Sequence, residues 1–282
     1  MRHPGVVDGA RRSVPPGHLC WSYDHVESLA DQAERHLVAS LAAGERFWYI
    51  TPRPADPVAD RLRALPDFAA AARRGAAAVI PLFSTYSHGQ IVDPATQVAA
   101  YAAATDEALG DGHSGLRVVA EATELVRSPA QLDAFTRYEH QIDHYMRARP
   151  FSAMCAYHRP TLGAAAITEL ACMHPESNVE GLLFRLYAPA PGDGHAALAG
   201  ELDMSNHELF RTALARADLR PTGGELVLSA PELRFLDHRA LAHLAEYAHR
   251  RGATAVLRTP RSAAARLVDL LELPGVRVEI VP

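Results

Sequence analysis

The sequence predicts a two-domain α/β protein, in which a domain with a mainly parallel sheet is followed by a smaller α/β domain. Apolar segments alternate with segments of helical spacing along the first part of the chain, which is the pattern of βαβ units. After residue 175 two strand-like segments adjoin a Gly-rich turn, which indicates a hairpin. The 282 residues also suit two domains.

The first domain is expected to contain five strands and five helices in alternation. The helix that begins at residue 26 should end before Gly44, because glycine is common just after a helix. Pro94 suits the first turn of its helix, and Ser128 suits an N-cap. The expected strands are 18–23, 46–51, 76–82, 115–120 and 152–157, and the expected helices are 26–43, 57–65, 94–109, 128–147 and 162–173.

The second domain is expected to begin with a hairpin and to continue as alternating helices and strands. We place a mobile tail at 1–16, the first domain at 17–180 and the second at 181–282, with the boundary near 178–181. The expected strands are 182–187, 196–202, 225–228, 254–257 and 276–281, and the expected helices are 206–217, 237–251 and 263–271.

Charge and composition narrow the class of protein. The net charge of -5 argues against nonspecific binding to nucleic acid, which needs a basic face. We see no apolar run long enough to cross a bilayer and no apolar leader, so we expect a cytoplasmic protein that does not bind membranes. Three cysteines, an odd and sparse set, do not form a disulfide framework. In a reducing compartment they are expected to be buried thiols.

Residues 182–282 contain ordered motifs of a signalling module. The segments are Ala199-Gly-Glu-Leu-Asp203-Met-Ser-Asn206, Glu225-Leu-Val-Leu-Ser-Ala-Pro-Glu-Leu-Arg-Phe-Leu-Asp237 and Arg258-Thr-Pro-Arg-Ser262. Together they resemble the STAS domain of bacterial anti-sigma factor antagonists. The resemblance implies a partner-binding surface around Asp237, His238 and Arg239. Because the family's regulatory serine is replaced by His238, the phosphorylation switch of that family is in doubt, although constitutive partner binding is not.

Short motifs also run in order through the first domain. They are His18-Leu-Cys20-Trp-Ser-Tyr23-Asp24, Ala43-Gly-Glu45-Arg46, Gly89-x-x-x-Asp93-Pro94, Gly115-Leu-Arg117 with Glu121, Tyr138-Glu139, Cys155-Ala-Tyr157 and His174-Pro175. They resemble the MEDS domain, a sensory module of methanogen and methylotroph regulators. The resemblance implies a RecA-like α/β core that senses small organic compounds, and it fits a sensor fused to a STAS-like output domain.

A RecA-like core raises the question of nucleotide binding. After the first strand the chain reads Tyr23-Asp-His-Val-Glu-Ser-Leu, which has neither the glycines nor the lysine of a phosphate-binding loop. Asp24 and Glu27 would also repel phosphate. We therefore expect no nucleotide turnover and no cofactor.

A ligand of a parallel sheet is expected beyond the carboxyl ends of the strands. Aromatic and polar side chains at those ends suit a small, mostly apolar ligand. Thr51, Arg53, Thr123 and the segment 83–88 belong to this edge, although any one of its residues could be an ordinary loop residue. The candidate ligand-binding residues, taken with the histidine and cysteines of the strands, are His18, Cys20, Tyr23, Asp24, Tyr86, His88, Glu121, Cys155, Tyr157 and His158.

A soft-metal site is the alternative use of the cysteines. Cys20, Cys155 and Cys172-Met-His174 are the set that could form it with His18 and His158, but the spacing is not that of a zinc finger. We therefore favour buried thiols and expect no metal.

Two features of the helix over 128–147 also call for an interpretation. Helical spacing places His140 and His144 opposite the apolar stripe, so we expect a solvated pair rather than a metal site. Glu139 lies beside that stripe, and a carboxylate there needs a partner such as Arg117 or a ligand.

The first hypothesis for function is a signalling protein and not an enzyme. Its first domain would bind a small organic ligand, and its second would bind a protein partner such as an anti-sigma factor or a histidine kinase. A homodimer is left open. The second hypothesis is an enzyme of unrecognised type that uses Asp24, Glu121 and His158 as acid–base groups. The third is a scaffold that binds partners without sensing a ligand.

Overall fold

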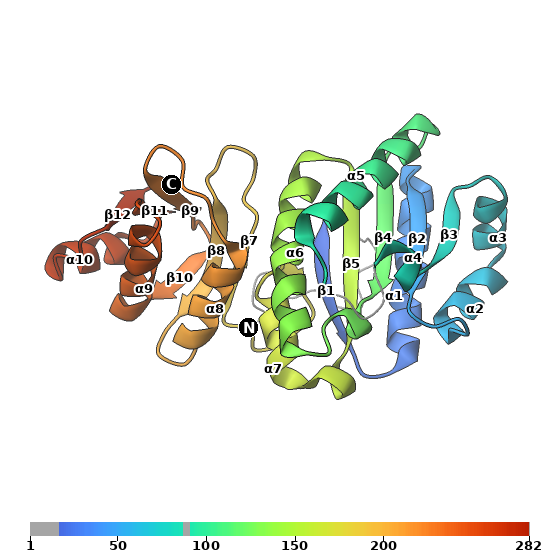
Figure 1. Ribbon diagram of the computed structural model, residues 1–282, viewed down its shortest axis with the longest axis horizontal. Helices are drawn as coiled ribbons and strands as arrows, with labels where there is room; N and C mark the ends of the chain where they lie inside the picture. Colours follow the sequence, from blue (N-terminus) through green and yellow to red (C-terminus); the bar gives the residue numbers. More distant parts are fainter. Residues whose placement is uncertain (1–16, 87–90, 282) are drawn as a thin grey trace. The chain divides into compact units, whose positions relative to one another are not determined.

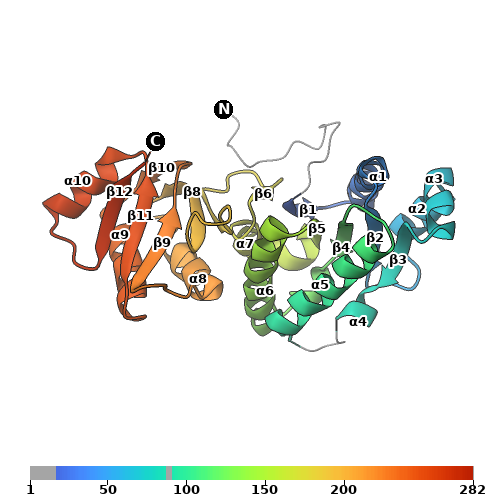
Figure 2. The same ribbon diagram turned by 90° about the horizontal axis from the view of Figure 1, so that it is seen from above.

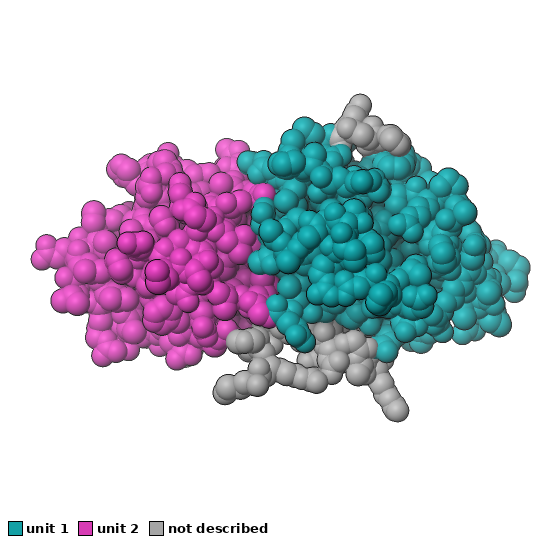
Figure 3. Space-filling view, turned by 90° about the horizontal axis from the view of Figure 1, so that it is seen from below, with its two compact units in different colours: residues 1–171, 176–180 teal, residues 172–175, 181–282 magenta. Residues whose placement is uncertain are grey.

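The computed structural model describes residues 17–86 and 91–281, so the expected tail over 1–16 and the candidate residue His88 lie outside the described residues (Figure 1). The chain divides into two compact units. The first comprises residues 1–171 and 176–180, and the second comprises residues 172–175 and 181–282 (Figure 3).

The first unit is built on a six-stranded sheet in which every pair of neighbouring strands is parallel. The strand order is β3-β2-β4-β5-β1-β6. The carboxyl ends of β4, β5 and β1 therefore lie side by side, although these strands are far apart in the sequence. The strands are β1 (His18–Tyr23), β2 (Arg46–Thr51), β3 (Ala77–Pro81), β4 (Leu116–Glu121), β5 (Phe151–His158) and β6 (Glu176–Ser177).

Helices cover both faces of this sheet (Figure 2). One face carries α1 (Val26–Ala43), α2 (Pro57–Ala64) and α3 (Pro66–Arg73). The other carries α5 (Pro94–Gly110) and α6 (Pro129–Ala148). The remaining helical elements are α4 (Leu82–Thr85), the short 3-10 helix η1 (Thr123–Leu125) and α7 (Arg159–Ala171).

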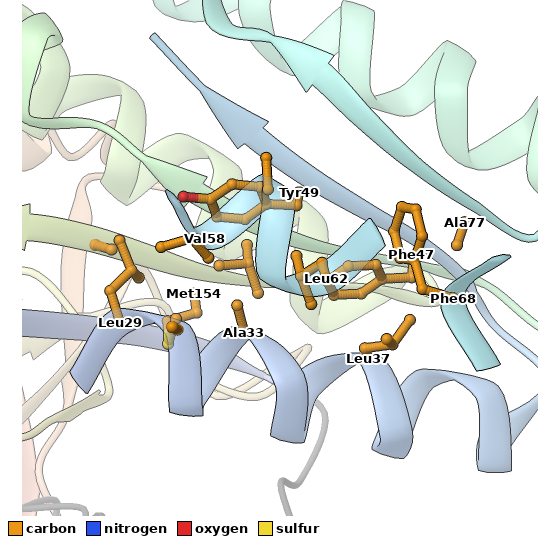
Figure 4. Packing of buried hydrophobic residues seen from close by; sticks show 14 of the residues in the cluster. Leu29, Ala33, Leu37, Phe47, Tyr49, Val58, Leu62, Phe68, Ala77 and Met154 are labelled. Atoms are coloured by element: carbon orange, nitrogen blue, oxygen red, sulfur yellow. The ribbon is translucent and has the colours of Figure 1, made fainter. Parts of the chain in front are cut away.

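The main apolar core lies between the sheet and the first group of helices (Figure 4). Leu29 and Leu37 of α1 and Leu62 of α2 pack with Phe47 and Tyr49 of β2. All five side chains are at most 1% exposed, and burial of each contributes about 1.5–3 kcal/mol. This core holds the strands in register and so fixes where each strand ends.

The second unit has a mixed sheet in the order β10-β8-β9-β11-β12, with β7 antiparallel to β8. Its strands are β7 (Phe184–Tyr187), β8 (Ala196–Leu202), β9 (Glu225–Ser229), β10 (Leu233–Leu236), β11 (Thr254–Thr259) and β12 (Val276–Ile280). Its helices are α8 (His207–Ala217), α9 (His238–His249) and α10 (Ser262–Leu270). In the parts of the chain that the structure describes, no helix has the length and apolarity needed to cross a membrane.

The predicted fold class is confirmed: a RecA-like, mainly parallel sheet is followed by a smaller α/β unit. Gly44 ends α1 with a φ of 72°, and Ser128 is the N-cap of α6, as the sequence indicated. Ser128 also forms a capping box with Gln131. Five short elements were not predicted: α3, α4, η1, β6 and β10. The last helix of the first unit begins at Arg159 and not at residue 162, since its first turn precedes a kink at Gly163 (φ 79°).

Candidate functional site: two polar clusters of the first unit

The first cluster lies at the carboxyl ends of β1, β4 and β5. We call Tyr23, Glu121, Thr123 and His158 the strand-end cluster. The Tyr23 hydroxyl donates to Glu121 Oε1 at 3.0 Å, and the Thr123 hydroxyl and backbone N–H donate to the same oxygen. Thr123 Oγ1 accepts from the backbone N–H of His158 at 2.9 Å. The cluster thus joins three neighbouring strands, and the rings of Tyr23 and His158 lie 5.2 Å apart.

Burial governs the charge of this cluster. Desolvation raises the pKa of Glu121, although hydrogen bonds from Thr123 and Tyr23 and the nearby charge of Arg53 oppose the shift. Burial and the neighbouring Glu121 raise the pKa of Tyr23 well above its usual range, so Tyr23 stays a neutral donor. The arrangement is a buried set of donors and acceptors that can orient a polar group at the sheet edge.

Replacing Glu121 with glutamine should stabilise the protein at neutral pH. The folded-state pKa of Glu121 is raised above its ordinary value of 4.5, so folding disfavours the ionised carboxylate. The corresponding stability is present below pH 4.5 and is lost as pH rises through the folded pKa. Urea unfolding from pH 4 to 8 should show Glu121→Gln more stable than the wild type at pH 7, with a gap that closes on acidification. A gap independent of pH would contradict this account.

The second cluster lies under α6, on the face of the sheet opposite to that covered by α1, α2 and α3. We call His18, Glu139, Asp143, Cys155 and Tyr157 the buried histidine cluster. His18 Nε2 lies 2.9 Å from Glu139 Oε2, and the Tyr157 hydroxyl donates to Glu139 Oε1 at 2.5 Å. Cys155 Sγ is 3.5 Å from Glu139 Oε2 and 3.8 Å from His18 Nε2. His18 Nδ1 lies 3.4 Å from Asp143 Oδ1.

The side chains of His18, Glu139 and Asp143 are at most 1% exposed. Burial alone would lower the pKa of His18, but the carboxylates of Asp143 and Glu139 outweigh it and raise that pKa to about 9. Burial, followed by the charge of Glu139, raises the pKa of the Cys155 thiol. Such a concentration of ionisable groups away from water is typical of functional sites.

Aromatic side chains adjoin this cluster. The Tyr86 hydroxyl is within 3.1 Å of the Tyr101 hydroxyl and 3.5 Å of the Tyr138 hydroxyl. The ring of Phe135 packs against those of Tyr86, Tyr138 and Tyr157 with centroids 5.2–6.5 Å apart. Tyr86, which was expected at the sheet edge, is therefore part of a buried aromatic group.

The candidate residues divide between the two clusters. Tyr23, Glu121 and His158 come together at the strand ends, whereas His18, Cys155 and Tyr157 meet under α6. Cys20 pairs in register with Cys155 on the neighbouring strand. Asp24 forms an ion pair with Arg159. Cys172 and His174 are buried in the segment 172–175, which belongs to the second unit.

Two expectations on α6 are corrected. His140 is 2% exposed, so it does not form a solvated pair with His144, and its ring lies edge-on to that of His144. Arg117 bonds to Glu45 with its Nε and one terminal nitrogen, whereas Glu139 is hydrogen-bonded to His18, Cys155 and Tyr157. Asp143 was missed. Its position four residues after Glu139 places both carboxylates on one helix face, which is the signal that could have found it.

The candidate partner-binding residues lie at the start of α9. Asp237 is the N-cap and accepts from the backbone N–H of Ala240 at 2.9 Å. His207 Nε2 lies 2.9 Å from Asp237 Oδ2, so this carboxylate also ties α8 to α9. His238 and Arg239 are exposed.

The parallel sheet, with one polar cluster at its strand ends and another under α6, defines a RecA-like α/β domain. A family model described as the methanogen/methylotroph DcmR sensory domain, MEDS, matches residues 17–175. This match covers more than half of the chain, and the protein belongs to the MEDS family. The family suggests a sensory role in signalling. No curated protein and no solved structure matches the chain.

Proposed function

We propose that this protein is a sensor and not an enzyme, with a small organic ligand bound in the first unit and a protein partner bound by the second. The observation that carries the proposal is the strand-end cluster on a MEDS domain. Tyr23, Glu121 and His158 meet where parallel sheets bind ligands. The hydrogen bonds of the cluster suit a ligand with one polar group, such as a short alcohol or amine.

The second unit supports the partner half of this proposal. Its motifs resemble those of STAS domains, and Asp203 and Asp237 follow the adjacent strands β8 and β10. Met204 and Phe235 are 81% and 52% exposed, close in sequence to these aspartates and to the exposed His238 and Arg239. Exposed apolar side chains with adjacent charges are typical of binding surfaces. We propose an anti-sigma factor as the partner, because that is the class STAS-like antagonists bind.

Ligand binding is tested on the purified full chain with methanol, methylamine, ethanol and propan-1-ol, by ligand-observed NMR. We expect at least one of these probes to bind. Tyr23→Phe should weaken the binding of that probe about two- to tenfold, because the variant cannot form the proposed hydrogen bond between the Tyr23 hydroxyl and the probe, worth roughly 0.5–1.5 kcal/mol. Tyr187→Phe, in the second unit, is the matched control and should bind as the wild type does. No binding of any probe, or equal binding by Tyr23→Phe, would overturn the ligand half.

The partner half is measured with the host's anti-sigma factors by isothermal titration calorimetry. Phe235→Ser should weaken the complex at least tenfold. Ile280→Ser changes a side chain of similar exposure (54%) on β12 and should have no effect. Binding of a histidine kinase alone would replace the anti-sigma factor as the partner, and binding of neither would overturn this half.

A further inference from the structure

We propose that the buried histidine cluster is a metal site, in which His18 Nε2, Glu139 Oε2 and Cys155 Sγ bind a divalent transition metal of the Zn²⁺ type. All three ligands come from the first unit. The site is distinct from the strand-end cluster, and its assignment does not depend on the proposed sensory function. For Cys155 alone, it departs from the expectation, drawn from the sequence, that the cysteines are only buried thiols.

The distances between the three ligand atoms support this site. Zn–N and Zn–O bonds of about 2.0–2.2 Å and a Zn–S bond of about 2.3 Å place the ligands of a tetrahedral ion about 3.4–3.6 Å apart. The sulfur of Cys155 lies 3.5 Å from Glu139 Oε2 and 3.8 Å from His18 Nε2, close to those separations. The His18–Glu139 distance of 2.9 Å is that of a hydrogen bond, which would open by about half an ångström around an ion.

The surroundings of these ligands are those of a metal centre. A ligating histidine usually donates the N–H of its second ring nitrogen to a hydrogen-bond acceptor such as a carboxylate. Asp143 Oδ1 lies 3.4 Å from His18 Nδ1. Ligating carboxylates are also held by hydrogen bonds, and the Tyr157 hydroxyl holds the other oxygen of Glu139 at 2.5 Å. Asp143 therefore faces His18 without competing for Nε2, and Tyr157 holds Glu139 through Oε1 and leaves Oε2 to the metal.

The three ligand atoms indicate which metal ions the site would bind. One nitrogen, one oxygen and one sulfur form a borderline set that suits Zn²⁺ or Co²⁺ and not Mg²⁺ or Ca²⁺, which require oxygen ligands. The thiol of Cys155 and the Nε2–H of His18 each give up a proton to solvent as the metal binds, so the ligands are a thiolate and a neutral imidazole. Three side chains leave one position of a tetrahedral ion to a fourth donor, either water or a side chain that binds through nitrogen or oxygen.

The test uses tag-free full-length protein, so that a histidine tag contributes no metal. We expect about one zinc per chain by elemental analysis, and one sulfur among the ligands by X-ray absorption of the zinc form. Exchange for Co²⁺ should give a thiolate-to-cobalt charge-transfer band. Cys155→Ser should lose that band while circular dichroism shows an unchanged fold. Asp143→Asn should keep the band but lower the metal affinity about 10–100-fold.

Cys20→Ser is the matched control, because Cys20 is also buried and pairs in register with Cys155 on the adjacent strand. This variant should keep both the metal and the charge-transfer band. If Cys20→Ser loses the band, or if absorption finds two sulfurs, the three-ligand assignment is wrong. A wild-type protein that stays metal-free after dialysis against Zn²⁺ and Co²⁺ would overturn the site altogether, while leaving ligand binding at the strand-end cluster to be judged by its own titration.

Discussion

Replacing Gly200 with alanine is expected to destabilise the second unit by about 2–5 kcal/mol. Gly200 lies in β8 with a φ of +94°, a conformation that residues with a Cβ rarely adopt. A Cβ at this position would lie 2.2 Å from the backbone oxygen of Leu183 and 2.9 Å from the Cα of Phe184. Both atoms are backbone atoms, one just before β7 and one within it, so the clash can be relieved only if that strand moves. Overpacking and strain at φ each cost about 1–3 kcal/mol.

Urea unfolding, followed by circular dichroism, measures the loss. Gly224→Ala is the matched control, because Gly224 also has a positive φ (+77°) but no atom within 4 Å of the place that the new methyl group would occupy. The control should show only the conformational cost of about 1–2 kcal/mol. Equal losses for the two variants would mean that the close approach of β7 contributes nothing.

Replacing Arg117 with methionine should cost the first unit about 3–5 kcal/mol. The side chains of Arg117 and Glu45 are 3% and 14% exposed, and the guanidinium meets the carboxylate at 2.6 Å and 3.3 Å. Removing the arginine leaves Glu45 as a partly buried charge without its cation, which is more costly than the pair is worth. The double variant Arg117→Met/Glu45→Leu should recover most of the loss, because it removes both charges.

Thermal and urea unfolding of the single and double variants check this result. Arg63→Met breaks an exposed ion pair with Asp60 in the same unit, where the two side chains are 50% and 69% exposed. That loss should stay below about 1 kcal/mol. A double variant as unstable as Arg117→Met would show that the arginine acts through its apolar packing and not through its charge.

Local sequence signals predicted most helices and strands, since capping residues and apolar spacing act over a few residues. Gly44 and Ser128 are examples. The short elements β6 and β10 escaped because two to four residues carry too little periodicity. β10 is held by pairing with β8, a contact that local propensity does not encode.

The two clusters differ in how much of each could be predicted from the sequence. The rule that ligands bind at strand ends pointed to Tyr23, Glu121 and His158 before the strand order was known. The pairing of His18 with Glu139 spans 121 positions of the chain and depends on β1 lying beside β5. No pattern along the chain specifies that neighbour, so Glu139 could be recognised as needing a partner, but of the two partners considered, Arg117 and a ligand, the first was wrong.

Consecutive residues of β5 serve the two clusters: Tyr157 holds Glu139 on one face of the sheet, and the backbone of His158 is bonded to Thr123 at the strand end. A change in the path of this strand therefore disturbs both clusters at once. In the course of evolution, substitutions at one cluster that shift β5 are accepted only if the other tolerates the same shift. The two clusters are thus expected to have diverged together, as one inherited unit.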